Sequence, residues 1–208
     1  MPKFIISILL IIQVSLASDS DTVYEQLVHF QESHDPGYII LTDKREFYFY
    51  YKGLDFKEVY SWKKNRPLKL VYSKTKGSIL LDIKSKKYAE IESLNNGHLL
   101  DLALQNCLDK NQSTYGIAEC YNETTKLYES EVNRLLGKIK SKYSIKVYDA
   151  VYQMQKDWTK YKESRYDVGR VLSQDTVYTM GIIESSVRAL IPVKEQANFL
   201  ESVYFYKY

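Results

Sequence analysis

The sequence predicts an α+β protein, in which a small antiparallel β-meander is followed by a C-terminal helical bundle with one disulfide. Between Gly37 and Glu92, short aromatic and β-branched runs alternate with turn-forming residues, which is typical of about five or six antiparallel strands. From Gly97 onward, the apolar residues recur with the helical period. We therefore expect a β-rich unit over residues 18–95 and a helical unit over residues 96–208.

The first 17 residues have the order of a secretory signal peptide. Lys3 supplies a positive start, residues 4–14 are almost entirely apolar, and small residues precede a cleavage point after Ala17. This run is shorter than the roughly 20 apolar residues of a membrane-spanning helix, so we expect cleavage rather than an anchor. No later run could span a membrane, and no cysteine near the cut could carry a lipid. The sequence therefore predicts a periplasmic or secreted protein.

The β-rich unit is expected to bury one face of its sheet. Alternation over Leu68-x-Leu70-x-Tyr72 predicts one buried face and one wet face rich in lysine. Ahead of the strands, Thr22–Glu32 places Val23, Leu27 and Phe30 on one side of a short helix. The candidate strands are residues 38–41, 46–51, 56–62, 68–72, 78–83 and 88–91.

The helical unit is expected to contain five helices. Apolar stripes at helical spacing run over residues 99–108, 117–139 and 147–161. Ser113 or Thr114 is the expected N-cap of the long second helix. A fourth helix is expected over Thr176–Ile191, ended by Pro192, with a fifth from Val193 to the C-terminus.

The two cysteines of the chain, Cys107 and Cys120, are expected to form a disulfide, because exported proteins rarely keep a pair of free thiols. The bond would close a loop of about 14 residues and contribute roughly 3 kcal/mol in the chain-entropy model. With no histidine close by in the sequence, the pair does not resemble a zinc site.

Composition and motifs argue against several classes of function. The 29 basic residues nearly balance the 26 acidic ones, which is unlike a nucleic-acid-binding protein. No phosphate-binding loop or nucleophile elbow is present. The spacing of His29 and His34 suits no zinc motif, even with Glu25, Glu32 and Asp35 close by. Glu90 and Glu92 share a strand face, as the carboxylate pair of a glycosidase could, but they are expected to be ordinary exposed carboxylates. We therefore expect no enzyme activity, no cofactor and no metal site.

The helical half resembles the LprI-type lysozyme-inhibitor family over about residues 99–203. Three segments carry the resemblance: Cys107 with Ser113-Thr114-Tyr115-Gly116-Ile117-Ala118-Glu119-Cys120, then Glu129-x-x-Val132-Asn133, and then Val151-x-x-Met154-Gln155-x-x-Trp158-x-x-Tyr161-Lys162. The chain departs from the family where further cysteines are usual, at Arg165 or Tyr166 and within Ile182–Ile191. A second disulfide is therefore not expected.

The polar and aromatic residues of this motif have structural explanations. Trp158 and Tyr161 are three residues apart, so they share a helix face and are expected to pack in the bundle core. Gln155 and Asn133 interrupt apolar stripes, and we expect each to hydrogen-bond between helices or to a free carbonyl. Direct contact with a target is the alternative role for all four residues.

The resemblance implies an exported bacterial envelope protein that binds lysozyme and blocks its cleft. A local acidic set, Glu119, Glu123, Glu129 and Glu131, could steer the chain toward a basic enzyme. The alternative is a general protein- or glycan-interaction module of the envelope that does not inhibit lysozyme. Its candidate surface is the basic face of the sheet, comprising Lys63, Lys64, Arg66, Lys69, Lys74, Lys76, Lys84, Lys86 and Lys87.

Overall fold

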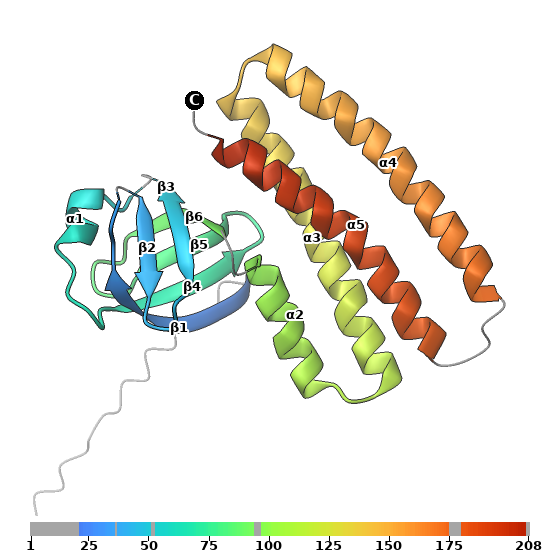
Figure 1. Ribbon diagram of the computed structural model, residues 1–208, viewed down its shortest axis with the longest axis horizontal. Coiled ribbons are helices and arrows are strands. Elements are labelled where there is room, and N and C mark those ends of the chain that lie inside the picture. Colours follow the sequence, from blue (N-terminus) through green and yellow to red (C-terminus); the bar gives the residue numbers. More distant parts are fainter. Residues whose placement is uncertain (1–20, 36, 51–52, 94–96, 175–179, 207–208) are drawn as a thin grey trace, which may run out of the picture.

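Six antiparallel strands form a barrel, and long helices extend from one side of it (Figure 1). The computed structural model describes residues 21–35, 37–50, 53–93, 97–174 and 180–206. The expected signal peptide, its cleavage point at Ala17 and the junction between residues 95 and 96 lie outside the described residues. The predicted α+β class and the order of its two parts are confirmed.

The barrel consists of two three-stranded meanders that pair with each other at both edges. Its closed order is β1-β2-β3-β6-β5-β4, and every pair is antiparallel. Closure leaves no sheet edge exposed, whereas an open meander would expose the backbone groups of its edge strands. The prediction was therefore correct for the antiparallel strands but missed the closure. The strands are β1 (Thr22–Glu32), β2 (Tyr38–Leu41), β3 (Glu46–Tyr50), β4 (Pro67–Ser73), β5 (Gly77–Asp82) and β6 (Tyr88–Ser93).

Two elements of the β-rich part differ from the prediction. Thr22–Glu32 is the strand β1 rather than a helix, and Leu27, placed on the apolar side of that helix, is 58% exposed. Pairing with both β2 and β4 gives β1 its conformation, and these partners are distant in sequence. Residues 56–62 were expected to form a strand, but Phe56–Tyr60 is the short helix α1. Asp55 caps α1 by accepting a hydrogen bond from the backbone N–H of Lys57.

Four helices follow the barrel: α2 (Leu99–Lys110), α3 (Thr114–Lys142), α4 (Ile145–Gln174) and α5 (Met180–Phe205). Of the two predicted N-caps of α3, Ser113 is the one observed. Its hydroxyl accepts a 3.0 Å hydrogen bond from the N–H of Gly116. The expected break at Pro192 is wrong, because this proline lies inside α5. Leu190, Val193 and Leu200 of α5 are all buried, so tertiary packing outweighs the backbone hydrogen bond that proline cannot make.

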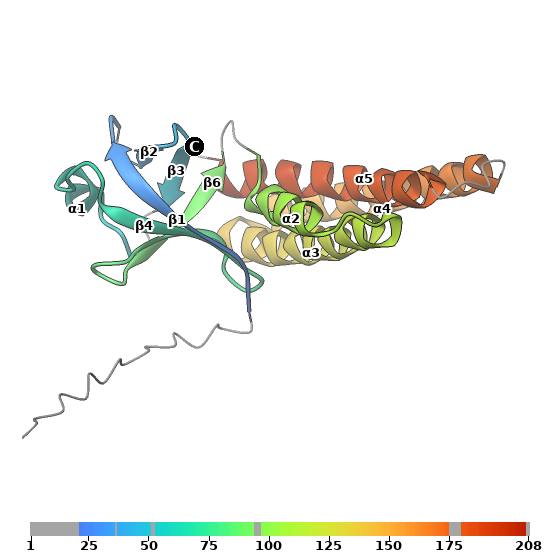
Figure 2. The ribbon, with the colours of Figure 1, turned by 90° about the horizontal axis from the view of Figure 1, so that it is seen from below.

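The predicted disulfide is present and joins α2 to α3, with 5.7 Å between the Cα atoms of Cys107 and Cys120. The two ribbon views agree that α3 and α5 run side by side (Figures 1 and 2), and Figure 1 shows α4 farther from the barrel. The hydrophobic core is continuous from the barrel interior into these helices. Among the described helices, none combines the length and the hydrophobicity of a membrane-spanning segment.

Candidate functional site

The inward face of α4 changes character halfway along the helix. Val151 is buried, and Met154 and Trp158 pack against the core as a helical stripe. The next positions of the same stripe are Lys162 and Arg165, which cannot be buried as apolar side chains can. The second half of α4 therefore does not pack tightly against the bundle.

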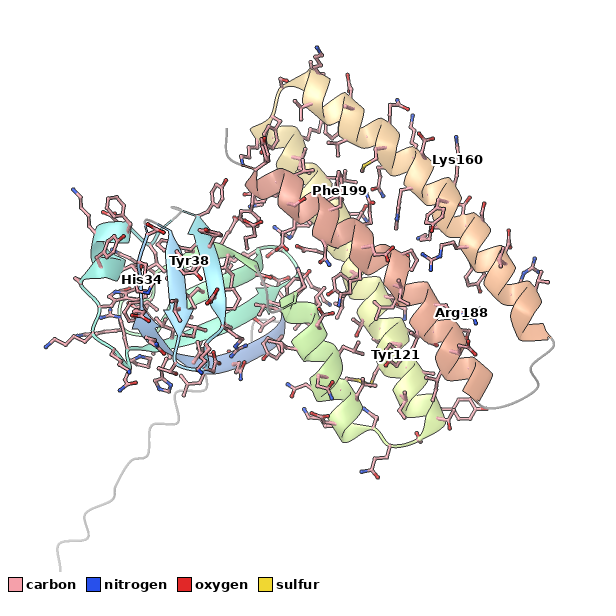
Figure 3. All side chains as sticks on the ribbon, in the orientation of Figure 1. His34, Tyr38, Tyr121, Lys160, Arg188 and Phe199 are labelled. Carbon is pink, nitrogen blue, oxygen red and sulfur yellow. A yellow bond between two sulfur atoms is a disulfide. The ribbon has the colours of Figure 1, made fainter. Side chains whose placement is uncertain are left out.

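A groove lies between this half of α4, the first half of α5 and one side of α3, with a cavity volume of about 1190 Å³. Gly169 of α4 lies on its wall, and a Cβ atom at this position would meet no atom within 4 Å. In Figure 3, Arg188 lies on the side of α5 next to α4, whereas Lys160 points away from the bundle. The groove is thus an open space that a larger side chain at Gly169 could enter.

The charged residues lining the groove are balanced in number. Its acidic side chains are Glu129, Glu163, Asp167 and Glu184, and its basic side chains are Lys162, Arg165, Arg170 and Arg188. Several form ion pairs along the walls: Lys162 with Glu129 at 2.9 Å, Arg188 with Glu184 at 2.5 Å and Arg170 with Asp167 at 3.5 Å. A surface of this kind offers many hydrogen-bond donors and acceptors without a strong net field.

Two tyrosines of α4 lie at the groove, Tyr161 with 53% of its surface exposed and Tyr166 with 66%. The Tyr161 hydroxyl accepts a 3.3 Å hydrogen bond from Arg165. The expectation that Tyr161 packs in the bundle core is therefore wrong, whereas Trp158 is partly buried with Lys162 over its ring. Exposed tyrosines are typical of recognition surfaces, because they present a large contact area on few rotatable bonds.

The two polar motif residues occupy different environments. Gln196 of α5 donates a 2.6 Å hydrogen bond from Nε2 to Oε1 of Gln155, so the interhelical bond expected for Gln155 is present. Asn133, by contrast, is exposed on α3. Gln155 therefore contributes to the attachment of α4 to α5, at the level where the helices are still in contact.

The other candidates from the sequence do not assemble into a site. The described residues contain no group of three or more His, Cys, Asp or Glu side chains that could hold a metal ion, which includes the set around His29 and His34. Glu90 is buried and pairs with Lys138 at 2.6 Å, so it is not an exposed strand carboxylate as expected. Glu131 is also buried, so the expected acidic set does not form one surface.

The basic face of the sheet is partly neutralised by its neighbours. Arg66 pairs with Asp82 at 2.7 Å, Lys69 with Glu25 at 2.8 Å and Lys87 with Glu58 at 2.8 Å. These pairs reduce the positive potential on which binding to an anionic polymer would depend. The groove is therefore the better candidate for a binding site.

Sequence reasoning missed the groove, although two local signals point to it. Arg165 interrupts the apolar stripe of α4, and Gly169 follows one turn later in a helix interior. Arg165 and Tyr166 of α4 stand where a further cysteine is usual in the family that the chain resembles, and both line the groove together with Arg188 of α5. No disulfide therefore holds the two walls together in this chain.

Comparison with known proteins supports the predicted resemblance. Residues 107–192 match the family model described as lysozyme inhibitor LprI, so the resemblance is confirmed over this helical segment. The matched segment contains every residue that lines the groove except Val193. No match was found among curated proteins or solved structures.

Proposed function

We propose that this protein is an exported, non-catalytic binding protein that inhibits lysozyme through the groove between α3, α4 and α5. The observation that carries the proposal is the overlap between the segment matching the lysozyme-inhibitor family and the walls of the groove. The sequence pattern of a cleavable signal peptide supports a periplasmic or secreted location, and the disulfide suits an oxidising compartment.

The chemistry of the groove supports binding rather than catalysis. Its acidic side chains Glu129, Asp167 and Glu184 each lie within ion-pair distance of a lysine or arginine. Tyr161 and Tyr166 at the rim provide the aromatic contacts that concentrate binding energy in protein interfaces.

The test is a lysozyme-inhibition titration with the mature chain and two tryptophan variants. Gly169→Trp fills the groove, and Gly137→Trp is its matched control, because Gly137 is also a helical glycine with no atom within 4 Å of an added Cβ but lies outside the groove. We expect the wild type and Gly137→Trp to slow lysozyme and Gly169→Trp to lose at least ten-fold in affinity, about 1.4 kcal/mol. Circular dichroism would confirm that both variants are folded.

Two outcomes would contradict the proposal. If micromolar excess of the wild type leaves the rate of lysozyme unchanged, this chain does not inhibit the enzyme. If Gly169→Trp and Gly137→Trp inhibit equally, the groove is not the contact surface.

A second candidate function is a glycan-binding module without lysozyme inhibition. The observation that favours it is the neutral balance of four acidic and four basic groove side chains beside two exposed tyrosines. Neutral sugars need both donors and acceptors, together with aromatic faces for stacking. Calorimetric titration with soluble peptidoglycan fragments tests this function: heat of binding from the wild type but not from Gly169→Trp would support it.

A further inference from the structure

A cluster of buried polar side chains lies where the barrel meets the helices. Tyr72 of β4, His98 at the start of α2 and Arg134 of α3 all lie next to Glu131 of α3, and Glu201 of α5 interacts electrostatically with His98, Glu131 and Arg134. We call these five residues the junction cluster. Tyr72, His98, Glu131 and Glu201 are each at most 7% exposed. Buried charge is costly unless it is compensated, so the protonation states of these groups affect how the parts hold together.

Glu131 and Arg134 form the permanently charged part of the cluster. Arg134 donates two hydrogen bonds to the Glu131 carboxylate, at 2.7 and 2.6 Å, and the Tyr72 hydroxyl donates a third at 2.8 Å. Burial alone would raise the pKa of Glu131, but the hydrogen bonds and charges of Arg134 and His98 hold that pKa well below its ordinary value. This pair contributes one negative and one positive charge.

His98 is held by a cap on one nitrogen and faces Glu131 with the other. Its Nδ1 accepts a 3.1 Å hydrogen bond from the N–H of Leu100, and its Nε2 lies 3.7 Å from Oε1 of Glu131. The rings of Tyr72 and Tyr128 enclose the imidazole, with centroids at 5.5 and 5.3 Å. Because Nδ1 is an acceptor, the capped state is the neutral imidazole with its proton on Nε2, and a second proton would weaken the cap.

Glu201 is the acidic group of the cluster that lacks a permanent counter-charge. Burial raises the pKa of Glu201 to about 7; the charge on Glu131 acts in the same direction, whereas His98 and Arg134 oppose the shift. Burial by itself would lower the pKa of His98, but the carboxylates of Glu131, Glu201 and Asp101 hold that pKa above its ordinary value. His98 and Glu201 therefore each hold a proton more tightly than usual, and they act on each other electrostatically.

The charged groups around the cluster are already paired. Asp101 of α2 contacts Lys194 of α5 at 2.8 Å and accepts a 2.9 Å hydrogen bond from Tyr128. Glu90 of β6 contacts Lys138 of α3 and accepts a hydrogen bond from Tyr204 of α5. Glu92 of β6 adds a further acidic influence on Glu201. None of these surrounding pairs supplies a spare positive charge for Glu201.

We propose that the junction cluster is a pH-sensitive coupling that shares one proton between His98 and Glu201 and holds α5 against the barrel while that proton is bound. When the proton is on Glu201, the cluster carries one negative charge, on Glu131, and one positive charge, on Arg134. With the proton on His98, two positive charges face two negative ones. Loss of the proton leaves one uncompensated buried negative charge, which weakens the junction.

The coupling extends to the groove, because α5 contributes Glu201 near its end and Gly181 to Val193 along the groove wall. This coupling does not depend on which partner binds in the groove. Since the folded-state pKa of Glu201 lies above its ordinary value of 4.5, its contribution to stability is fully present below pH 4.5 and is lost as the pH rises through about 7.

The experiment measures the melting temperature of the mature chain from pH 5.5 to 9 at constant ionic strength. We expect the wild type to lose about 5–10 °C over this range. Glu201→Gln should remove most of the loss and melt above the wild type at pH 9. Glu195→Gln, on the exposed side of α5, is the matched control and should behave like the wild type. A wild type without the loss, or a Glu201→Gln variant that keeps it, would overturn the proposal.

Two further measurements test the sharing of the proton and the location of the effect. His98→Asn keeps an N-cap acceptor but removes one of the two proton-holding groups, so the midpoint of the loss should move to lower pH. Hydrogen exchange, corrected for intrinsic rates, should show the amides of residues 197–205 losing protection at pH 9 before those in the middle of α3. An unmoved midpoint would exclude His98 from the sharing, and uniform loss of protection would exclude a local junction.

Discussion

Tyr72 of β4 donates a 2.8 Å hydrogen bond to Glu131 of α3, and both side chains are buried. The two residues are 59 positions apart, so this bond connects the barrel directly to the long central helix of the bundle. Glu131 is also bound by Arg134, whose guanidinium donates to the backbone carbonyl of Lys76 in the turn before β5 at 3.2 Å. The barrel and helices are thus joined by polar contacts as well as by a continuous apolar core.

Replacing Tyr72 with phenylalanine should lower the free energy of unfolding by about 1.5–3 kcal/mol, because a hydrogen bond to a buried charged acceptor is lost. Urea denaturation at pH 7 would measure the change. Tyr115→Phe is the control, since Tyr115 is 73% exposed and its replacement should leave stability within about 0.5 kcal/mol of the wild type. Equal stability of Tyr72→Phe and the wild type would show that the bond contributes nothing.

The disulfide should stabilise the α2–α3 hairpin. The double variant Cys107→Ser, Cys120→Ser should lose roughly 3 kcal/mol, because a closed loop of about 14 residues no longer restricts the unfolded chain. Denaturation of the wild type with and without a reducing agent provides the comparison. The reduced wild type should match the double variant, which itself should be indifferent to the reducing agent.

Asp82 should make the barrel sensitive to acid. Burial by itself would raise its pKa, but hydrogen bonds from Arg66, Ser85 and the backbone hold the pKa of this carboxyl well below its ordinary value of 3.8. Its stabilising contribution is therefore present above pH 3.8 and is lost as the pH falls further. Asp82→Asn should cost about 3 kcal/mol at pH 7, and the difference from the wild type should shrink in an acid titration. A constant difference down to pH 2 would contradict this assignment.

Two glycines should respond in opposite ways to alanine. Gly169→Ala adds a methyl group in open space on a helix and should stabilise the protein by about 0.5–1 kcal/mol. Gly53→Ala should destabilise it by more than about 1 kcal/mol, because Gly53 has a φ of +112° and an added Cβ would lie 2.7 Å from the carbonyl oxygen of Tyr88. Thermal denaturation of the two variants would separate these effects, and a shift of the same sign would refute the explanation.

Local patterns predicted most secondary structure, and they failed where a distant partner decides the conformation. In Thr22–Glu32, Val23, Leu27 and Phe30 have helical spacing, but ladders to β2 and β4 make the segment a strand. Pro192 is a strong local stop signal, yet α5 continues through it because its apolar residues pack along α3. Neither partner is apparent in the local pattern of the segment itself.

The candidate site was predictable only in part. The motif around Gln155 and Trp158 lies on α4, which forms one wall of the groove, but the sequence analysis gave these residues structural roles. The family match over residues 107–192 includes this helix. The exposure of Tyr161 could not be predicted from its helical spacing. Whether that face of α4 is buried depends on the distance to the neighbouring helix. Gly169 can be recognised as part of the groove only once the structure shows that the space beside it is open.

By itself, the sequence determined the strands β2 to β6, the region that folds into helices, the Cys107–Cys120 pairing and the resemblance in the helical half. These features depend on side-chain periodicity, local capping and short loop closure, which act between near neighbours. Only the tertiary structure decided the closure of the barrel, the groove beside Gly169 and the approach of His98 to Glu131. Each of these depends on contacts between segments far apart in the chain, whose geometry no local pattern records.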